Sequence, residues 1–249
     1  PRTMTKPKAK NYGNFQLISE DIPNCLIFRR WGWDKVGKNH FGFTMPDPIL
    51  GLYLDPAGTK GVAQKFIKGL VPGIPKKEIR EIQYRFNKKF DDQDKAIEVR
   101  DRWIEDYQHA LTVARSIQWD ESETWELFRF AEFGRESDLQ REYGPLNGMY
   151  RGLIQDAFDA GVNLQLIQKV KTKWVKGVST DEMEPVGFKQ AGNIVQASLQ
   201  HTWSADEGFV VTIVNCRQNT EIWGLPVPDL TFPQLGTLVY PDTSEEDWQ

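Results

Sequence analysis

The chain contains the stretch Gly32-Trp33-Asp34-Lys35-Val36-Gly37-Lys38-Asn39, with a glycine at each end of the turn and a lysine after the second glycine. Residues 24–30 before it have the length and apolar content of a short buried strand, and residues 40–44 after it can begin a helix. Strand, glycine turn and helix are the context in which G-x-x-x-x-G-K spacing forms a phosphate-binding loop. The glycines let backbone N–H groups point inward at a phosphate chain, and the helix N-terminus adds partial positive charge.

The loop predicts a set of ligand-binding residues, with Lys38 reaching the terminal phosphates. Asn39 stands where such loops carry Ser or Thr, whose hydroxyl binds magnesium, so the sequence supports nucleotide binding better than hydrolysis. The alternative is that this spacing arises by chance in a surface turn. The residues expected to hold the phosphates are Gly32, Val36, Gly37, Lys38, Asn39 and His40.

Composition limits the class of protein. A chain of 249 residues with 39% hydrophobic content suits one α/β domain with a full core. A net charge of -4 argues against coating duplex DNA by bulk charge, but leaves room for a local basic groove. Cys25 and Cys216 lie in apolar runs and are expected to be core residues rather than a disulfide, which fits an intracellular, cytoplasmic location.

The ends of the chain differ in charge. Residues 1–23 form a basic arm without the hydrophobic run of a secretory signal, and no apolar run is long enough to cross a membrane. Residues 241–249 are acidic with one tryptophan, which favours a solvated tail. The folded core is therefore expected to span residues 24–240.

Two strand ends supply candidate carboxylates. Residues 115–120 are predicted to form a strand ending at Asp120, and in phosphate-loop proteins such a carboxylate holds magnesium beside the loop because the two strands are neighbours. Glu121 and Glu123 are the nearest candidates for polarising an attacking water. Asp55, after the strand predicted over residues 49–55, is a second candidate, with helix capping as the equal alternative.

The remaining pattern alternates helices and strands. Amphipathic helices are predicted over 75–89, with a basic face, and over 91–113. A third follows Tyr143-Gly144-Pro145 and runs through Met149 to Phe158, and a strand is predicted over 163–168. Two apolar runs at 195–203 and 209–215 flank a turn and predict an antiparallel pair.

A basic, aromatic segment follows the 163–168 strand. Its lysines and tryptophan suit a mobile loop with the charge and stacking surface that single-stranded nucleic acid requires, although an ordinary protein surface is an equal alternative. The residues concerned are Lys169, Lys171, Lys173, Trp174 and Lys176.

The order of these parts resembles the RecA-type recombinase core, and more closely the compact phage RecA-like ATPases associated with single-strand annealing. The resemblance covers residues 24–248 and rests on the phosphate loop, the Asp120 strand, the strand ending in Gln168, the lysine-rich segment, residues 187–193 and the two final strands. It implies a mostly parallel central sheet with helices on both faces. It also implies ATP with Mg²⁺ at subunit interfaces of a homo-oligomer, with single-stranded DNA and a single-strand-binding protein as partners.

The resemblance also implies roles for particular residues. Gln168 would sense the terminal phosphate, residues 169–188 would form one DNA loop, and the segment carrying Arg135 and Arg141 would form another. Arg217 would reach a neighbouring subunit's nucleotide. Asp120 and Asn39 would hold the metal.

Two departures from the family concern catalysis. Asn39 replaces the hydroxyl residue, and Asp55 is followed by Pro56 and Ala57 where recombinases carry a glutamate. DNA-dependent ATPase activity therefore stays open. The rival hypothesis from the residues is a phosphate-loop NTPase acting on a protein partner or a small phosphoryl acceptor.

Overall fold

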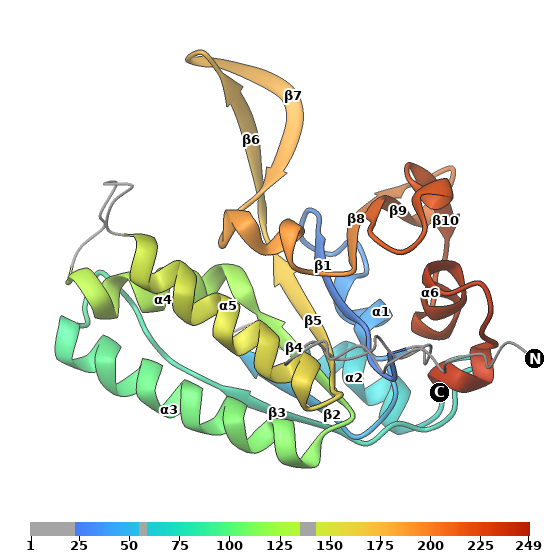
Figure 1. Ribbon diagram of the computed structural model, residues 1–249, viewed down its shortest axis with the longest axis horizontal. Coiled ribbons are helices and arrows are strands. Elements are labelled where there is room, and N and C mark those ends of the chain that lie inside the picture. Colours follow the sequence, from blue (N-terminus) through green and yellow to red (C-terminus); the bar gives the residue numbers. More distant parts are fainter. Residues whose placement is uncertain (1–22, 55–58, 135–142) are drawn as a thin grey trace, which may run out of the picture.

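The computed structural model describes residues 23–54, 59–134 and 143–249 (Figure 1). Its α-helices are α1 (Lys38–Gly42), α2 (Lys60–Ile67), α3 (Gln93–Val113), α4 (Glu121–Phe133), α5 (Tyr143–Asp159) and α6 (Phe232–Val239). Its strands are β1 (Ile27–Trp31), β2 (Ile49–Tyr53), β3 (Ile79–Gln83), β4 (Ser116–Asp120), β5 (Asn163–Gln168), β6 (Val170–Val175), β7 (Val178–Pro185), β8 (Ala197–Ser204), β9 (Gly208–Cys216) and β10 (Leu225–Pro228). Short 3₁₀ turns are η2 (Lys189–Asn193), η3 (Thr220–Ile222) and η4 (Glu245–Trp248).

Eight strands form one sheet in the order β10-β9-β8-β1-β5-β4-β2-β3. The strands from β8 to β3 pair in parallel, whereas β8, β9 and β10 pair antiparallel. Every residue of β4 and β5 is buried, as parallel strands covered on both faces require. The predicted α/β class, with a mostly parallel sheet and a C-terminal antiparallel pair, is confirmed, and β10 adds a third antiparallel strand.

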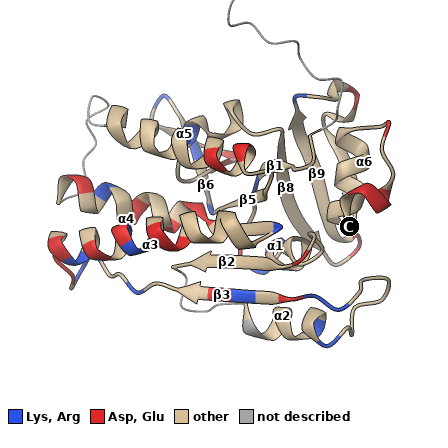
Figure 2. Ribbon diagram, turned by 60° about the horizontal axis from the view of Figure 1, so that its bottom comes forward, with Lys and Arg blue, Asp and Glu red and all other residues tan. Residues whose placement is uncertain are grey.

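Each face of the sheet carries its own core. α3, α4 and α5 pack on one face around a cluster of stacked and tilted aromatic rings, Trp103, Tyr107, Trp119, Phe128 and Tyr150. α1 and α6 pack on the other face around Phe28, Phe41 and Phe232. Figure 2 shows charges of both signs along the outer sides of α3 and α4, as solvated helix faces require. Within the described ranges, no helix combines the length and apolarity needed to cross a bilayer.

The predicted helix over residues 75–89 is wrong. This segment forms β3, the edge strand of the sheet, which pairs in parallel with β2 from Ile79 opposite Ile49 to Gln83 opposite Tyr53. The open edge of β2 offers backbone partners to a segment whose apolar residues are too few to decide between a helix and a half-exposed strand.

The lysine-rich segment after β5 is not an irregular loop. β6 and β7 form an antiparallel hairpin that stands out from the body of the molecule (Figure 1). Its turn is Lys176-Gly177, both with positive φ, as tight hairpin turns require.

The acidic C-terminal segment is only partly a solvated tail. Its acidic side chains are exposed, but Trp248 is buried against α6, with its ring stacked on Tyr240 at 5.6 Å and packed on Gly236. The indole N–H donates a hydrogen bond of 2.8 Å to Thr243. The end of the chain therefore completes the core on the α6 face.

Trp248→Ala should lower the free energy of unfolding by about 3 kcal/mol or more, because it removes a buried ring and leaves a cavity beside α6. Urea denaturation measures the change. Glu246→Ala, an exposed neighbour, is the control and should shift stability by no more than about 0.5 kcal/mol. Equal effects of the two substitutions would show that this end of the chain does not belong to the core.

Candidate phosphate-binding site

The glycine loop joins β1 to α1, as its sequence predicts, and Lys38 holds it closed. The Lys38 amine donates hydrogen bonds of 2.6 Å to the carbonyl oxygens of Gly32 and Trp33. α1 has only five residues, so its dipole adds little. Of the loop's charged side chains, Lys38 is half-buried, whereas Asp34 and Lys35 are exposed.

Both glycines of the loop are enclosed by the antiparallel strands. A side chain on Gly32 would collide with the carbonyl oxygen of His201 and would lie 2.8 Å from Val36. Gly37 has a φ of +84°, and a Cβ there would lie 3.1 Å from the ring of Phe209. These positions require glycine because β8 and β9 press directly against the loop.

The Lys38 amine has an unusual electrostatic setting. Burial lowers its pKa to about 8, and the positive charge of Arg30 acts in the same direction, whereas Asp34 and Asp120 oppose the shift. Among the described residues, the hydrogen-bond acceptors of this partly desolvated cation are carbonyl oxygens, which the oxygens of an anion can replace.

Asp120 lies at the same edge of the sheet, although not on a strand next to β1. β5 lies between β1 and β4, which corrects the expectation that the two strands are neighbours. The carboxylate is buried, and the backbone N–H of Leu54 approaches its Oδ2 at 3.4 Å. Asp55 itself lies outside the described residues.

Glu121 binds the base of the hairpin instead of facing water. Its buried carboxylate accepts hydrogen bonds from Gln168 Nε2 at 2.8 Å and from the backbone N–H of Phe188 at 2.7 Å. Burial raises the pKa of Glu121 to about 8, although both hydrogen bonds favour the charged form. Gln168 and Glu121 are thus bonded to each other, an arrangement that the sequence did not predict.

The rest of the first turn of α4 also anchors the hairpin. Ser122 Oγ donates to the carbonyl of Val186 at 2.9 Å and accepts from the backbone N–H of Lys169 at 2.8 Å. The Lys169 amine forms an ion pair with Glu123. Both strands of the hairpin are therefore fixed to the helix that begins directly after Asp120.

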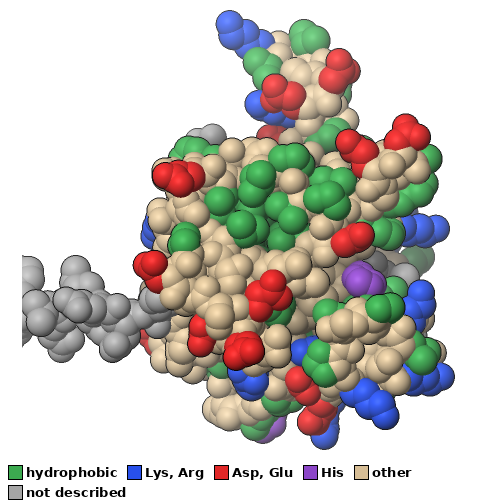
Figure 3. Space-filling model, turned by 90° about the vertical axis from the view of Figure 1, so that its right-hand side faces the viewer, with side chains coloured by type: hydrophobic (Ala, Val, Ile, Leu, Met, Phe, Trp, Pro, Cys, Tyr) green, Lys and Arg blue, Asp and Glu red, His purple; other side chains and the backbone are tan. Residues whose placement is uncertain are grey.

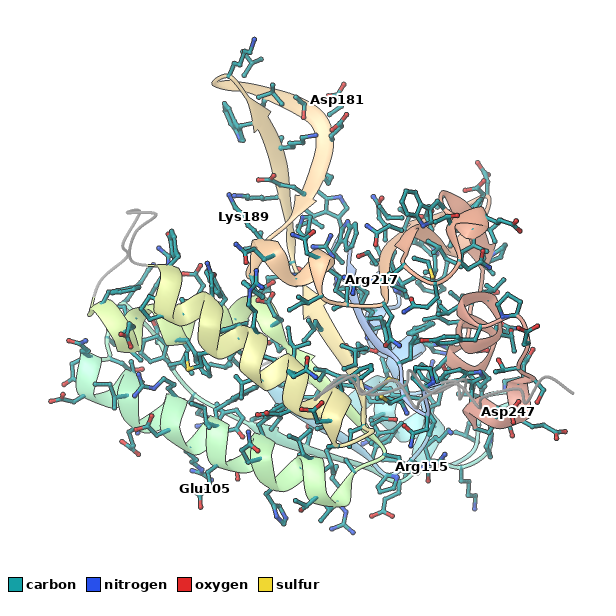
Figure 4. All side chains as sticks on the ribbon, viewed as in Figure 1. Glu105, Arg115, Asp181, Lys189, Arg217 and Asp247 are labelled. Atoms are coloured by element: carbon teal, nitrogen blue, oxygen red, sulfur yellow. The ribbon has the colours of Figure 1, made fainter. Side chains whose placement is uncertain are left out.

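The hairpin's predicted DNA-binding lysines are paired with carboxylates. Lys171 lies 3.2 Å from Glu184, and Lys173 lies 2.6 Å from Glu182. Trp174, 65% exposed, and Lys176 project into solvent near the turn. Figure 3 shows side chains of both signs on the protruding hairpin, and Figure 4 places Asp181 on its outer part and Lys189 at its base. The hairpin surface is mixed in charge rather than uniformly basic.

The other predicted residues fall in different places. Val36 is buried within the loop, Asn39 is half-buried in α1, and the ring of His40 packs edge-on against Phe66 at 4.8 Å. Arg217 lies at the opposite end of β1 from the glycine loop. Its backbone N–H donates to the carbonyl of Gln196, whose own N–H donates to the carbonyl of Ile27 at the start of β1. It therefore does not meet its own chain's loop. Arg135 and Arg141 lie outside the described residues.

The sequence patterns did not indicate two features of the site. Phe209 and Trp203 face each other across β9 and β8, and both are partly exposed beside the loop. Arg30, directly below the loop, is fully buried. The sequence contained a sign of Arg30's unusual position, because a charged residue inside an otherwise apolar strand has to be buried or paired.

Glu121→Gln should remove the contribution of Glu121 to the fall in the free energy of unfolding between about pH 4.5 and pH 8. The carboxyl's pKa is 4.5 in an unfolded chain and about 8 here, so the folded protein holds an extra proton in this interval and loses stability as pH rises. As pH rises, the free energy of unfolding of the variant should therefore increase relative to that of the wild type, by a few kcal/mol in total. Urea denaturation across this interval tests it. A profile for Glu121→Gln that runs parallel to that of the wild type across this interval would contradict the assignment.

The chain matches no protein-family model, and no curated protein matches it. Any functional conclusion therefore rests on the geometry of the loop and the strand ends around it.

Proposed function

We propose that the loop of residues 32–39 binds the phosphates of a nucleoside triphosphate, ATP in the first instance, in a RecA-like protein that assembles on single-stranded DNA. One observation carries the nucleotide part: the partly buried Lys38 amine, bonded to two loop carbonyls, lies at the sheet edge where Asp120 ends β4. Phosphate oxygens would replace those carbonyls as acceptors, with stronger, charge-assisted bonds.

Magnesium fits the same edge of the sheet. Mg²⁺ takes oxygen ligands and is commonly held by one or two protein groups together with substrate phosphates. The Asp120 carboxylate and the Asn39 amide oxygen are the groups that would hold it. When bound, it would neutralise charge on the outer phosphates.

The aromatic pair beside the loop supports a nucleotide over a simple phosphate. The Phe209 ring touches the loop at Gly37, and Trp203 lies directly across the strand pair. Partly exposed rings at this position offer a flat surface to a nucleobase whose phosphates occupy the loop.

The hairpin supports the DNA part of the proposal. Trp174 offers a stacking surface. Exposed ion pairs such as Lys173–Glu182 contribute little to stability, so the lysines can exchange carboxylates for DNA phosphates. The hairpin is bonded to the helix following Asp120, so nucleotide and DNA binding are expected to be coupled. The order of loop, Asp120 strand, Gln168 strand, hairpin and antiparallel strands supports the RecA-like assignment and, with it, a homo-oligomer.

A second candidate function has its own support. The paired lysines leave the hairpin surface mixed in charge, with Trp174, Val175 and Val178 exposed near its turn. Such a surface also suits a protein partner, and the chain would then be a nucleotide-binding protein that acts on another protein.

Lys38→Ala should weaken the binding of ATP and of inorganic tripolyphosphate by about tenfold or more, because a charge-assisted hydrogen-bond donor is lost. Since the pKa of Lys38 is about 8 in the free protein, wild-type affinity should fall as pH rises through that value. Titration calorimetry at several pH values checks both. Lys35→Ala, in the same loop but exposed, is the control. Unchanged affinity in Lys38→Ala would overturn nucleotide binding at this loop.

Trp174→Ala should weaken the binding of a short single-stranded oligonucleotide by roughly fivefold to a hundredfold, since stacking on a base is lost. Replacing Lys171 and Lys173 together should also lower the slope of log affinity against log salt, by about 0.7 for each DNA phosphate that the variant no longer neutralises. Fluorescence anisotropy with and without ATP measures both, and Phe90→Ala, an exposed aromatic outside the hairpin, is the control. Failure of the wild type to bind DNA in any nucleotide state would leave the protein-partner function.

A further inference from the structure

Arg30 is a buried cation directly below the phosphate-binding loop. It is the fourth residue of β1, two positions before Gly32, and its side chain is fully buried. None of its three guanidinium nitrogens has a hydrogen-bond acceptor among the residues that the structure describes.

The groups around Arg30 do not offset its charge. The guanidinium carbon lies 5.4 Å from the centre of the Phe41 ring in α1, and His201 packs edge-on against that same ring. Besides burial, the charge of Arg30 lowers the pKa of Lys38, His40 and His201. Burial lowers the pKa of Arg30 itself, and among the described residues Tyr53 opposes this shift. The Tyr53 hydroxyl donates its hydrogen bond to Gln118 at 2.7 Å rather than accepting one from Arg30.

This arrangement is unfavourable in the free protein. Burying a charge without a counter-ion is strongly unfavourable, and a desolvated cation–π contact offsets only part of that cost. A polyanion on the loop, just above Arg30, would supply the missing negative charge through a region of low dielectric.

We propose that Arg30 is a positioning residue for polyphosphate: its fixed positive charge beneath the loop attracts the phosphate chain that Lys38 contacts, and bound phosphates serve as its counter-ion. This inference rests on the proposed function and adds to it a requirement for several negative charges. Triphosphates should gain more from Arg30 than monophosphates, because the attraction grows with ligand charge.

Removing the charge of Arg30 should therefore stabilise the free protein and weaken its binding of polyphosphate. Arg30→Met keeps a long side chain of similar shape and removes the buried charge. The free variant should therefore melt at a higher temperature than the wild type, while binding inorganic tripolyphosphate about tenfold more weakly and monophosphate with little change. Arg30→Lys retains the charge and should keep most of the tripolyphosphate affinity.

Arg29→Met is the matched control. Arg29 lies next in the strand, donates a hydrogen bond of 2.9 Å to Ser198 Oγ and lies near Glu121. Because this arginine has partners, its replacement should lower the melting temperature without selective loss of tripolyphosphate affinity. A purely structural role for Arg30 would make Arg30→Met behave in the same way.

The experiment measures melting temperatures of the free proteins and titration calorimetry with tripolyphosphate and monophosphate for wild type, Lys38→Ala and the three arginine variants. A stabilised Arg30→Met with weakened tripolyphosphate binding supports the inference. A destabilised Arg30→Met with wild-type affinity overturns it. If the wild type binds tripolyphosphate through Lys38 while Arg30→Met binds equally well, only the inference fails. If the wild type binds neither tripolyphosphate nor ATP, the proposed function fails and the inference fails with it.

Discussion

Parallel pairing of β1 with β5 on one side and β8 on the other is the interaction on which the candidate site depends. It fixes the carboxyl end of β1, where the glycine loop begins, beside the carboxyl ends of β5 and β4. Residues from three distant parts of the chain thereby reach one edge of the sheet. The antiparallel strand β9 then closes the loop from outside through Phe209. Loop shape is thus set by tertiary packing at least as much as by the loop's own glycines.

The first turn of α4 joins the carboxyl end of β4 to the hairpin. Asp120 ends β4, and the next three residues, Glu121, Ser122 and Glu123, bond to both ends of the hairpin. Two of these hydrogen bonds, both to the Glu121 carboxylate, are buried. The strong rise in the pKa of Glu121 follows from the same enclosure.

Sequence patterns predicted the buried strands because short apolar runs bounded by turn residues are typical of such strands. They predicted the long helix because apolar residues recur along it with a period of about 3.6. They failed over residues 75–89 because an edge strand is half exposed and its pattern is weak. They also gave no warning of the Glu121 contacts, which join residues 47 and 67 positions apart. Lys38 and Asp120 are candidates that local motifs alone suggest, whereas the paired state of Lys171 and Lys173 depends on the strand register of the hairpin.

The hairpin is attached to the body through its base, where hydrogen bonds run from α4 to Lys169, Val186 and Phe188. Gly187 lies against the Glu121 carboxylate, so this junction tolerates no larger residue. The outer part of the hairpin instead projects away from the body of the molecule (Figure 3). The base of the hairpin is therefore constrained by its contacts with α4, whereas the outer part is not. Substitutions in the outer part can alter the surface offered to a partner while leaving the core unchanged.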